Sequence, residues 1–170
     1  PDTITAEKLA VLKKCGVGRI SINPQTMDDG VLAAIGRKHT AEEVKRAFAL
    51  AKTFEFDSIN MDLISGLPGD NMEKFRKTVA EVIALDPDNI TLHTLTVKHG
   101  ANLAPMAQSV FAATADAMNE YAYGEFAKAG YFPYYLYRQK GTVDNLENVG
   151  FCKPGKEGIY NIFIMDETHT

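Results

Sequence analysis

The stretch from Ser58 to Asp70, SINMDLISGLPGD, decides the fold class. Its first part, residues 58–65, is rich in Ile, Leu and Met and predicts a buried β-strand. Its second part, GLPGD at 66–70, contains two glycines and a proline, which predict a tight turn. Residues 72–85 follow with apolar side chains on one helical stripe. A strand, a turn and an amphipathic helix in this order predict a βαβ unit, and therefore a parallel sheet.

The same alternation extends along the chain on both sides of this stretch. Further strands are predicted at 17–23 and 89–96, and helical segments at 5–15, 28–35 and 41–54. The last of these helices opens with the capping box TAEE, in which a hydroxyl and a carboxylate satisfy two free N–H groups. Repeated βα units predict the α/β class. Three strands do not close a barrel, so the parallel part is either a small open sheet or a portion of a larger barrel.

The character of the sequence changes after residue 100. Residues 108–129 are rich in alanine and predict a long helix that ends at Gly130. Residues 131–170 are rich in aromatic residues and glycine, and they predict short strands and turns, arranged as hairpins. We therefore expect two parts: 1–104, which holds the parallel strands, and 105–170, which holds the long helix and a small α+β region.

The composition is ordinary for a soluble globular protein. Apolar residues make up 45% and charged residues 24% of the 170 residues, and the formal net charge is −4. The 18 Lys and Arg residues are scattered, which argues against a nucleic-acid partner, and no apolar run reaches the ~20 residues that span a bilayer. The opening residues do not read as a signal peptide. We therefore expect a cytoplasmic protein without a membrane partner.

Two cysteines, Cys15 and Cys152, are present. This is not the composition of a secreted protein that depends on disulfides. Two thiolates also do not suffice for a four-iron cluster, which takes three or four. His93 and His99 lack a nearby acidic pair and do not show the spacing of a zinc site. The sequence therefore predicts no metal site in this chain.

Polar residues near the carboxyl ends of the predicted strands are candidates for ligand binding, because ligands of parallel α/β sheets bind there. Asp62 lies in an otherwise apolar strand, where it is either a structural residue that caps a neighbouring loop or a ligand acceptor. Gln25 follows the first strand, and its amide suits ribose hydroxyls or an adenine edge. Arg37 precedes the capping box, and its guanidinium suits a carboxylate. On pattern alone, a solvent-exposed turn is the simpler interpretation for Gln25 and Arg37.

The turn at 66–70 precedes a helix N-terminus, where a phosphate can bind. It lacks the GxxxxGK[ST] and GxGxxG patterns of phosphate-binding loops. We expect Asp70 to be the N-cap of the following helix, and a carboxylate there would repel an anion. A plain βα turn is therefore the favoured interpretation.

Four segments in order carry a resemblance to a known family. They are RISINPQTMDDGVLAAIGRKHT at 19–40, NMDLISGLPGD at 60–70, PDNITLHTLTVKHGANL at 87–103 and FCKPGKEGIYNI at 151–162. They resemble, in turn, R-x-S-x-G-x-Q-S…L…x-G-R-x-H, N-x-D-L-I-x-G-L-P-G-Q, P-[DE]-x-[LI]-[ST]-x-Y-x-L-x…G-T-x-L and F-A-x-P-G-x-x-S-x-H-N. These are motifs of the oxygen-independent coproporphyrinogen III oxidases, which are radical S-adenosylmethionine (SAM) enzymes. Residues 134–150 are most similar to the HemZ-type branch of coproporphyrinogen dehydrogenases.

The resemblance implies the later half of a (β/α) radical SAM barrel, followed by a long helix and a small α+β region. Members of the family carry a C-x3-C-x2-C loop, a GGTP segment and an acidic residue, which this sequence lacks and which family order places before Pro1. By residue matching, Arg37 is implied to contact the methionyl carboxylate of SAM. Gln25 and Asp62 are implied to contact its ribose hydroxyls, and Thr96 to make a backbone-level contact.

Two departures from the family motifs concern these contacts. Asn23-Pro24 stands where the family has Gly-x before the glutamine, which changes the backbone approach to the ligand. Residues 158–160, Gly-Ile-Tyr, stand where the family has S-x-H. The porphyrin-side contacts of that motif are therefore not carried over to this chain.

The resemblance implies that the whole protein converts coproporphyrinogen III to protoporphyrinogen IX by oxidative decarboxylation in heme biosynthesis. SAM and a [4Fe–4S] cluster are the implied cofactors, and a porphyrinogen substrate and a reduced electron donor are the implied partners. We expect the present chain alone to be inactive and to carry neither cofactor. Two other functions stay open: a heme-binding or heme-delivery protein of the same family, and an unrelated α/β enzyme that binds phosphate at the GLPGD turn.

Overall fold

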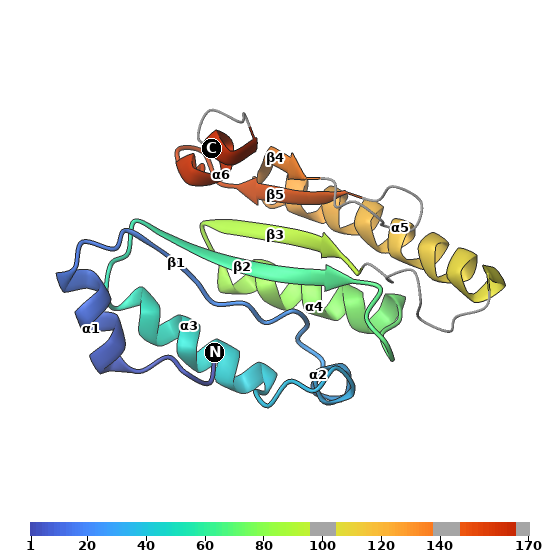
Figure 1. Ribbon diagram of the computed structural model, residues 1–170, viewed down its shortest axis with the longest axis horizontal. Coiled ribbons are helices and arrows are strands. Elements are labelled where there is room, and N and C mark those ends of the chain that lie inside the picture. Colours follow the sequence, from blue (N-terminus) through green and yellow to red (C-terminus); the bar gives the residue numbers. More distant parts are fainter. Residues whose placement is uncertain (96–104, 138–146, 166–170) are drawn as a thin grey trace.

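The computed structural model describes residues 1–95, 105–137 and 147–165, with side chains described throughout these ranges except at 105–113. Helices and strands alternate, and the first seven elements follow the predicted order (Figure 1). The elements are α1 (Ala6–Lys14), β1 (Arg19–Ser21), α2 (Asp29–Ala34), α3 (Ala41–Lys52), β2 (Ser58–Ser65), α4 (Met72–Leu85), β3 (Asn89–Thr94), α5 (Pro105–Lys128), β4 (Phe132–Tyr137), β5 (Asn148–Cys152) and α6 (Ile159–Met165).

The five strands form one mixed sheet in the order β1-β2-β3-β5-β4. β1, β2 and β3 run parallel, which confirms the predicted α/β class. β5 lies antiparallel beside β3, and β4 lies antiparallel on the far side of β5. The sheet therefore continues from the parallel strands into the C-terminal part of the chain. The predicted division at residue 104 falls in 96–104, outside the described residues, and stays a prediction.

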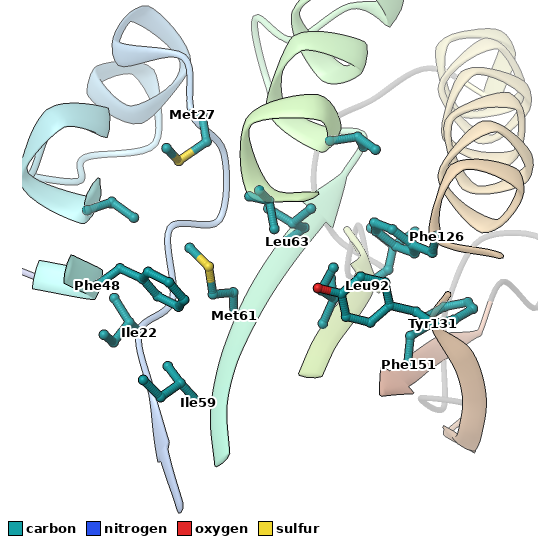
Figure 2. Packing of buried hydrophobic residues seen from close by; sticks show 14 of the residues in the cluster. Ile22, Met27, Phe48, Ile59, Met61, Leu63, Leu92, Phe126, Tyr131 and Phe151 are labelled. Carbon is teal, nitrogen blue, oxygen red and sulfur yellow. The ribbon is translucent and has the colours of Figure 1, made fainter. Parts of the chain in front are cut away.

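The core lies between the sheet and the helices α3, α4 and α5, which cover one of its faces (Figure 1). Because side chains alternate along a strand, β2 turns Ile59, Met61 and Leu63 to the helices, and all three are at most 2% exposed. Figure 2 shows Ile59 and Met61 near Phe48 of α3, and Leu63 farther along the strand. At the other end of the core, the rings of Phe126 and Phe151 lie 5.1 Å apart, joining α5 to β5.

Each such side chain contributes about 1.5–3 kcal/mol when it is fully buried. The packing of the helix-covered face therefore holds the strands in a fixed register, and with them the polar groups on the opposite face. Those polar groups come from alternating positions on β2 and β3. Asn60 and Asp62 lie on β2, and Thr91 and His93 lie on β3.

The helix α3 begins as the capping box predicts. The side chain of Thr40 accepts a hydrogen bond from the N–H of Glu43, and the Glu43 carboxylate accepts one from the N–H of Thr40 at 2.8 Å. The pKa of the Glu43 carboxyl is lowered, because its ionised form accepts hydrogen bonds from the N–H and from the hydroxyl of Thr40. The N-terminus of α3 is therefore fixed directly after the loop that carries Arg37.

Two expectations for the C-terminal part differ from the structure. The long helix begins at Pro105 instead of residue 108, which suits the preference for proline in a first helical turn. Residues 159–165, within the region predicted as strands and turns, form the helix α6. The N–H of Asn161 donates to the carbonyl of Gly158, and its amide donates to the hydroxyl of Tyr134 at 3.0 Å. These contacts outweigh the strand preference of IYNIFIM.

The ring of Tyr135 on β4 crosses directly over Gly150 on β5. A Cβ atom at Gly150 would lie 1.8 Å from Cε1 of that ring, so only glycine leaves room for it. The hydroxyl of Tyr135 then reaches Thr91 on β3, with 3.3 Å between the oxygens. The glycine thus allows β4 to place a phenol on the polar face of the parallel strands.

Replacing Gly150 by Ala is expected to destabilise the protein by about 1–3 kcal/mol, because the tyrosine ring must move out of a packed position. Urea unfolding measures the change. The same substitution at Gly124 in α5 is the control, because nothing lies within 4 Å of a Cβ atom there. That variant is expected to gain stability by up to ~1 kcal/mol through helix propensity. Equal stability of Gly150→Ala and the unsubstituted protein would contradict the described packing.

The two cysteines are free and lie in different environments. Cys15 is exposed at the C-terminal end of α1, and Cys152 is buried in β5. Burial raises the pKa of the Cys152 thiol to about 12. Within the described ranges, no helix is long and apolar enough to cross a membrane.

Candidate functional site

The site lies after the end of β1 and in the carboxyl half of β2, where Gln25 lies beside Asp62. The N–H of Gln25 donates to the carbonyl of Asp62 at 3.0 Å, and the carbonyl of Gln25 accepts from the N–H of Ile64 at 2.9 Å. Gln25 thereby forms a parallel bridge with Leu63. Its φ of 69° is in the left-handed region, which is uncommon for a residue other than glycine and typical of strained functional positions. Backbone pairing thus brings together two of the predicted site residues.

One oxygen of the Asp62 carboxylate accepts a hydrogen bond, and the other faces His93 without one. Its Oδ1 accepts a hydrogen bond from the amide of Asn60 at 2.7 Å. Its Oδ2 lies 3.8 Å from Nε2 of His93, which is too long for a hydrogen bond. Both partners come from the sheet itself, and in the described part of the chain no loop N–H is capped by this carboxylate. Neither contact is the loop cap that the sequence left open as the structural interpretation of Asp62.

Arg37 lies on the loop between α2 and α3 and is exposed. Its N–H donates to the carbonyl of Leu32 at 2.9 Å, and Gly36 before it has a φ of 73°, so the chain turns sharply after α2. The structure therefore places the guanidinium in solvent, where it is free to meet an anionic group. Thr96 lies outside the described residues.

His39 connects the Arg37 loop to the Gln25 loop. It is only 5% exposed, and its Nε2 lies 3.2 Å from the carbonyl of Pro24. Because a carbonyl only accepts hydrogen bonds, Nε2 carries the proton in this contact. Sequence reasoning assigned no role to His39, although the G-R-x-H spacing contained the signal. The contact therefore holds the loop that carries Arg37 against the loop that carries Gln25.

The turn at 66–70 does not form a phosphate site. Asn71, and not Asp70, caps α4: its side chain accepts from the N–H of Lys74 at 3.0 Å. The predicted N-cap is therefore wrong by one residue. Asp70 instead accepts from the N–H of Asn71 at 2.8 Å, and Lys74 reaches Asp28 at 3.4 Å. Burial, with a contribution from the nearby Asp28 carboxylate, raises the pKa of Asp70. An anion at this helix end would meet the carboxylate of Asp70.

Because the pKa of Asp70 is raised, the folding stability is expected to depend on the charge of this side chain. Its ionised form is disfavoured in the folded chain, so its charge costs stability above the folded pKa, and the cost disappears below the unfolded value near 3.8. Asp70→Asn keeps an acceptor for the Asn71 N–H. This variant is expected to be more stable at about pH 7, by less than about 1 kcal/mol because the side chain is partly exposed.

Urea unfolding at about pH 7 and about pH 3 measures this advantage, which is expected to shrink toward acid. Asp57→Asn, at an exposed carboxylate, is the matched control. A variant that loses stability at neutral pH, or whose advantage grows in acid, would count against this electrostatic account.

The comparisons with known proteins identify the family of the chain and its fold. A model of the radical SAM superfamily matches residues 1–82, and a Bacillus subtilis protein, the oxygen-independent coproporphyrinogen-III oxidase-like protein HemZ, is 46% identical over 173 residues that include all of this chain. The chain belongs to the radical SAM superfamily. The predicted family and the predicted α/β fold are thereby confirmed.

Other relatives of this radical SAM chain are named either as heme chaperones or as coproporphyrinogen III oxidases. The heme chaperone HemW of Bacillus subtilis is 31% identical over 76% of the chain and 39% of its own length. The oxygen-independent coproporphyrinogen III oxidase of Pseudomonas aeruginosa is 39% identical over 49% of the chain and 18% of its own length. The match to HemZ covers 34% of HemZ. The radical SAM chain thus spans about a third of the length of HemZ and of HemW.

Among solved structures, coproporphyrinogen III oxidase (HemN) from Escherichia coli matches with a TM-score of 0.67 and 20% identity. The match covers 90% of the radical SAM chain and 33% of HemN. At this identity the likeness concerns the fold. It indicates that the five-stranded sheet and its helices are a portion of a radical SAM enzyme fold.

Proposed function

We propose that this chain is part of an oxygen-independent coproporphyrinogen III oxidase, in which it binds the methionyl and ribose groups of SAM. The observation that carries the proposal is the pairing of Gln25 with Asp62 at the carboxyl edge of the parallel strands. This pairing occurs in a chain that is 46% identical to HemZ over its whole length. The proposed reaction is the oxidative decarboxylation of coproporphyrinogen III to protoporphyrinogen IX.

The donor and acceptor types at the site fit SAM. A ribose presents two hydroxyl donors, and Asp62 in the carboxyl half of β2 offers a carboxylate oxygen that is too far from His93 for a hydrogen bond. The methionyl group presents a carboxylate, and Arg37 offers an exposed guanidinium that can bind it with two parallel bonds. Gln25, Arg37 and Asp62 are therefore the proposed SAM-binding residues. Thr96 is proposed as a further backbone contact.

The residues of this chain do not fit an iron–sulfur cluster. In the described ranges, no group of three or more His, Cys, Asp and Glu side chains is placed to hold a metal. Cys15 and Cys152 lie at the end of α1 and in the middle of the core, respectively. The cluster is therefore proposed to belong to other residues of the whole protein. SAM, when it is bound and reduced, supplies the hydrogen-abstracting power that the decarboxylation needs.

The work of this chain in the proposed reaction is to bind and orient. Asp62 and Gln25 contact the ribose hydroxyls, and Arg37 neutralises the methionyl carboxylate. Asp62 lies on the polar face of β2, and the apolar packing on the opposite face of the sheet keeps that strand rigid. A porphyrinogen substrate, a reduced electron donor and a cytoplasmic location belong to the same proposal. So does the division into a barrel part, 1–104, and a C-terminal part, 105–170.

A second function is favoured by one observation. The heme chaperone HemW of Bacillus subtilis matches 76% of the chain at 31% identity. A heme-binding or heme-delivery role in a protein without oxidase activity is therefore the alternative. The unrelated phosphate-binding enzyme is no longer an alternative, because the chain is a radical SAM protein and its GLPGD turn ends in a partly buried carboxylate.

An anaerobic assay of the whole protein distinguishes the oxidase function from the chaperone function. With SAM, a reductant and coproporphyrinogen III, an oxidase produces protoporphyrinogen IX over many turnovers, measured by porphyrin fluorescence after oxidation. A chaperone produces none and instead binds added heme in a stoichiometric complex, measured by its absorption spectrum. We expect turnover. Stoichiometric heme binding without any decarboxylation would replace the proposed function with the alternative.

A further inference from the structure

We infer that Asn60 is a positioning residue, which orients the carboxylate of Asp62 so that one of its oxygens is reserved for a ligand hydroxyl. This inference rests on the proposed binding of SAM by Asp62. The observation behind it is a continuous row of side-chain hydrogen bonds across the polar face of the sheet. The row runs from Tyr135 through Thr91 and Asn60 to Asp62.

Asn60 is the centre of this row and has an unusually full set of partners. It is 3% exposed, and its amide nitrogen donates to Oδ1 of Asp62 at 2.7 Å and to the hydroxyl of Ser21 at 3.3 Å. Its carbonyl oxygen accepts from the hydroxyl of Thr91 at 3.1 Å. A buried amide with partners on both ends has one orientation, because any rotation leaves polar atoms unsatisfied.

The chemistry of Asp62 fixes the direction of every bond in the row. A carboxylate only accepts hydrogen bonds, so the amide nitrogen, and not the oxygen, of Asn60 faces Asp62. The hydroxyl of Thr91 then donates to Asn60, and its oxygen is left to accept from the hydroxyl of Tyr135. Burial raises the pKa of Tyr135, which keeps that donor protonated. A row of bonds that all point toward the carboxylate strengthens each member.

The consequence for Asp62 is that its two oxygens have different roles. Oδ1 is held by Asn60 at 2.7 Å, a distance typical of a charge-assisted hydrogen bond. Oδ2 lies 3.8 Å from His93 and keeps its capacity to accept. The carboxylate is therefore oriented before the ligand binds. Binding then does not have to include the entropy cost of ordering this side chain.

The test uses the whole protein and compares binding of SAM with binding of its 2′-deoxy and 3′-deoxy ribose analogues by anaerobic equilibrium dialysis. The unsubstituted protein is expected to bind at least one analogue about tenfold or more weakly, because a charge-assisted hydrogen bond is lost. Asp62→Asn and Asn60→Asp are both expected to lose this preference. Asn60→Asp keeps the side-chain shape and the acceptor for Thr91, but replaces the donor that faces Asp62 with a second carboxylate.

The matched control is Asn119→Asp, at an asparagine of equal 3% exposure on the helix-covered side of the sheet. The amide of Asn119 donates to the hydroxyl of Thr94 and does not contact Asp62. The variant therefore introduces a buried carboxylate away from Asp62. This control is expected to keep the preference for the ribose hydroxyls. A loss of the preference in Asn119→Asp would show that any buried charge disturbs the site, and would overturn the specific role of Asn60.

The outcomes separate this inference from the proposed function. If Asp62→Asn loses the preference and Asn60→Asp keeps it in full, Asp62 binds the ribose and the inference about Asn60 is wrong. If Asp62→Asn itself keeps the preference, the proposed SAM contact is wrong. If Asn60→Asp does not fold, Thr91→Val decides, because it removes only the hydroxyl that holds the carbonyl of Asn60. A preference that is unchanged in Thr91→Val then overturns the inference.

Discussion

Replacing Asp62 by Asn is expected to weaken SAM binding by the whole protein about 10- to 100-fold. The estimate follows from the ~1.5–3 kcal/mol of a hydrogen bond to a charged group, which the neutral amide does not supply. The substitution keeps the shape of the side chain, so the pairing of Asp62 with Gln25, which uses only backbone atoms, is expected to persist. Equilibrium binding of SAM under anaerobic conditions measures the effect.

The control for this prediction lies at the other end of the same strand. Asp57 precedes β2 and is exposed, and Asp57→Asn removes the same charge far from the carboxyl edge of the sheet. It is expected to leave SAM affinity within about twofold, since an exposed charge contributes little at this separation. Equal losses in the two variants would mean that net charge, and not the site, governs binding.

Replacing Arg37 by Lys is also expected to weaken SAM binding strongly. Lysine keeps the positive charge but not the planar fork that binds a carboxylate with two parallel bonds. We expect SAM affinity to fall about tenfold or more, as for loss of a charge-assisted hydrogen bond. The folding stability is expected to stay unchanged because Arg37 is exposed.

Arg46→Lys is the matched control for this prediction, because Arg46 is an exposed arginine on α3. Binding of S-adenosylmethionine methyl ester, which lacks the free carboxylate, adds a second test. The unsubstituted protein is expected to bind the ester more weakly than SAM, and Arg37→Lys is expected to distinguish the two less. An Arg37→Lys variant with full affinity for SAM would remove Arg37 from the proposed site.

The sequence predicted the parallel part of the fold well because its signals are local. The apolar stretch 58–65, the turn after it and the amphipathic helix 72–85 each match their own structural period, and the structure confirms all three. The capping box at Thr40 was predicted from four residues, and the structure contains both of its hydrogen bonds. Local chemistry at helix ends is readable when the cap and its partner lie within one turn.

The C-terminal part was predicted less well because tertiary contacts determine it. The order of β5 between β3 and β4 depends on the pairing of Asn89 with Cys152, residues far apart in the chain. The sequence IYNIFIM favours a strand, yet it forms α6 through contacts of Asn161 with Gly158 and Tyr134. Neither result follows from local propensity.

The candidate site shows the same division. Asp62 was singled out because a carboxylate is unusual in an apolar strand. The strand-like bridge of Gln25 was not foreseen, because a left-handed residue after Asn23-Pro24 does not read as part of a strand. The roles of Asn60 and His39 depend on partners from other elements, Thr91 and Pro24, which only the folded chain brings near.

The most direct test of the central claim is a crystal structure of the whole protein with SAM bound. A ribose hydroxyl is expected within hydrogen-bond distance of Oδ2 of Asp62, while Oδ1 keeps its bond to Asn60. The methionyl carboxylate is expected to contact the guanidinium of Arg37. A SAM molecule bound away from the carboxyl edge of β1 and β2, without contact to Asp62, would contradict the account.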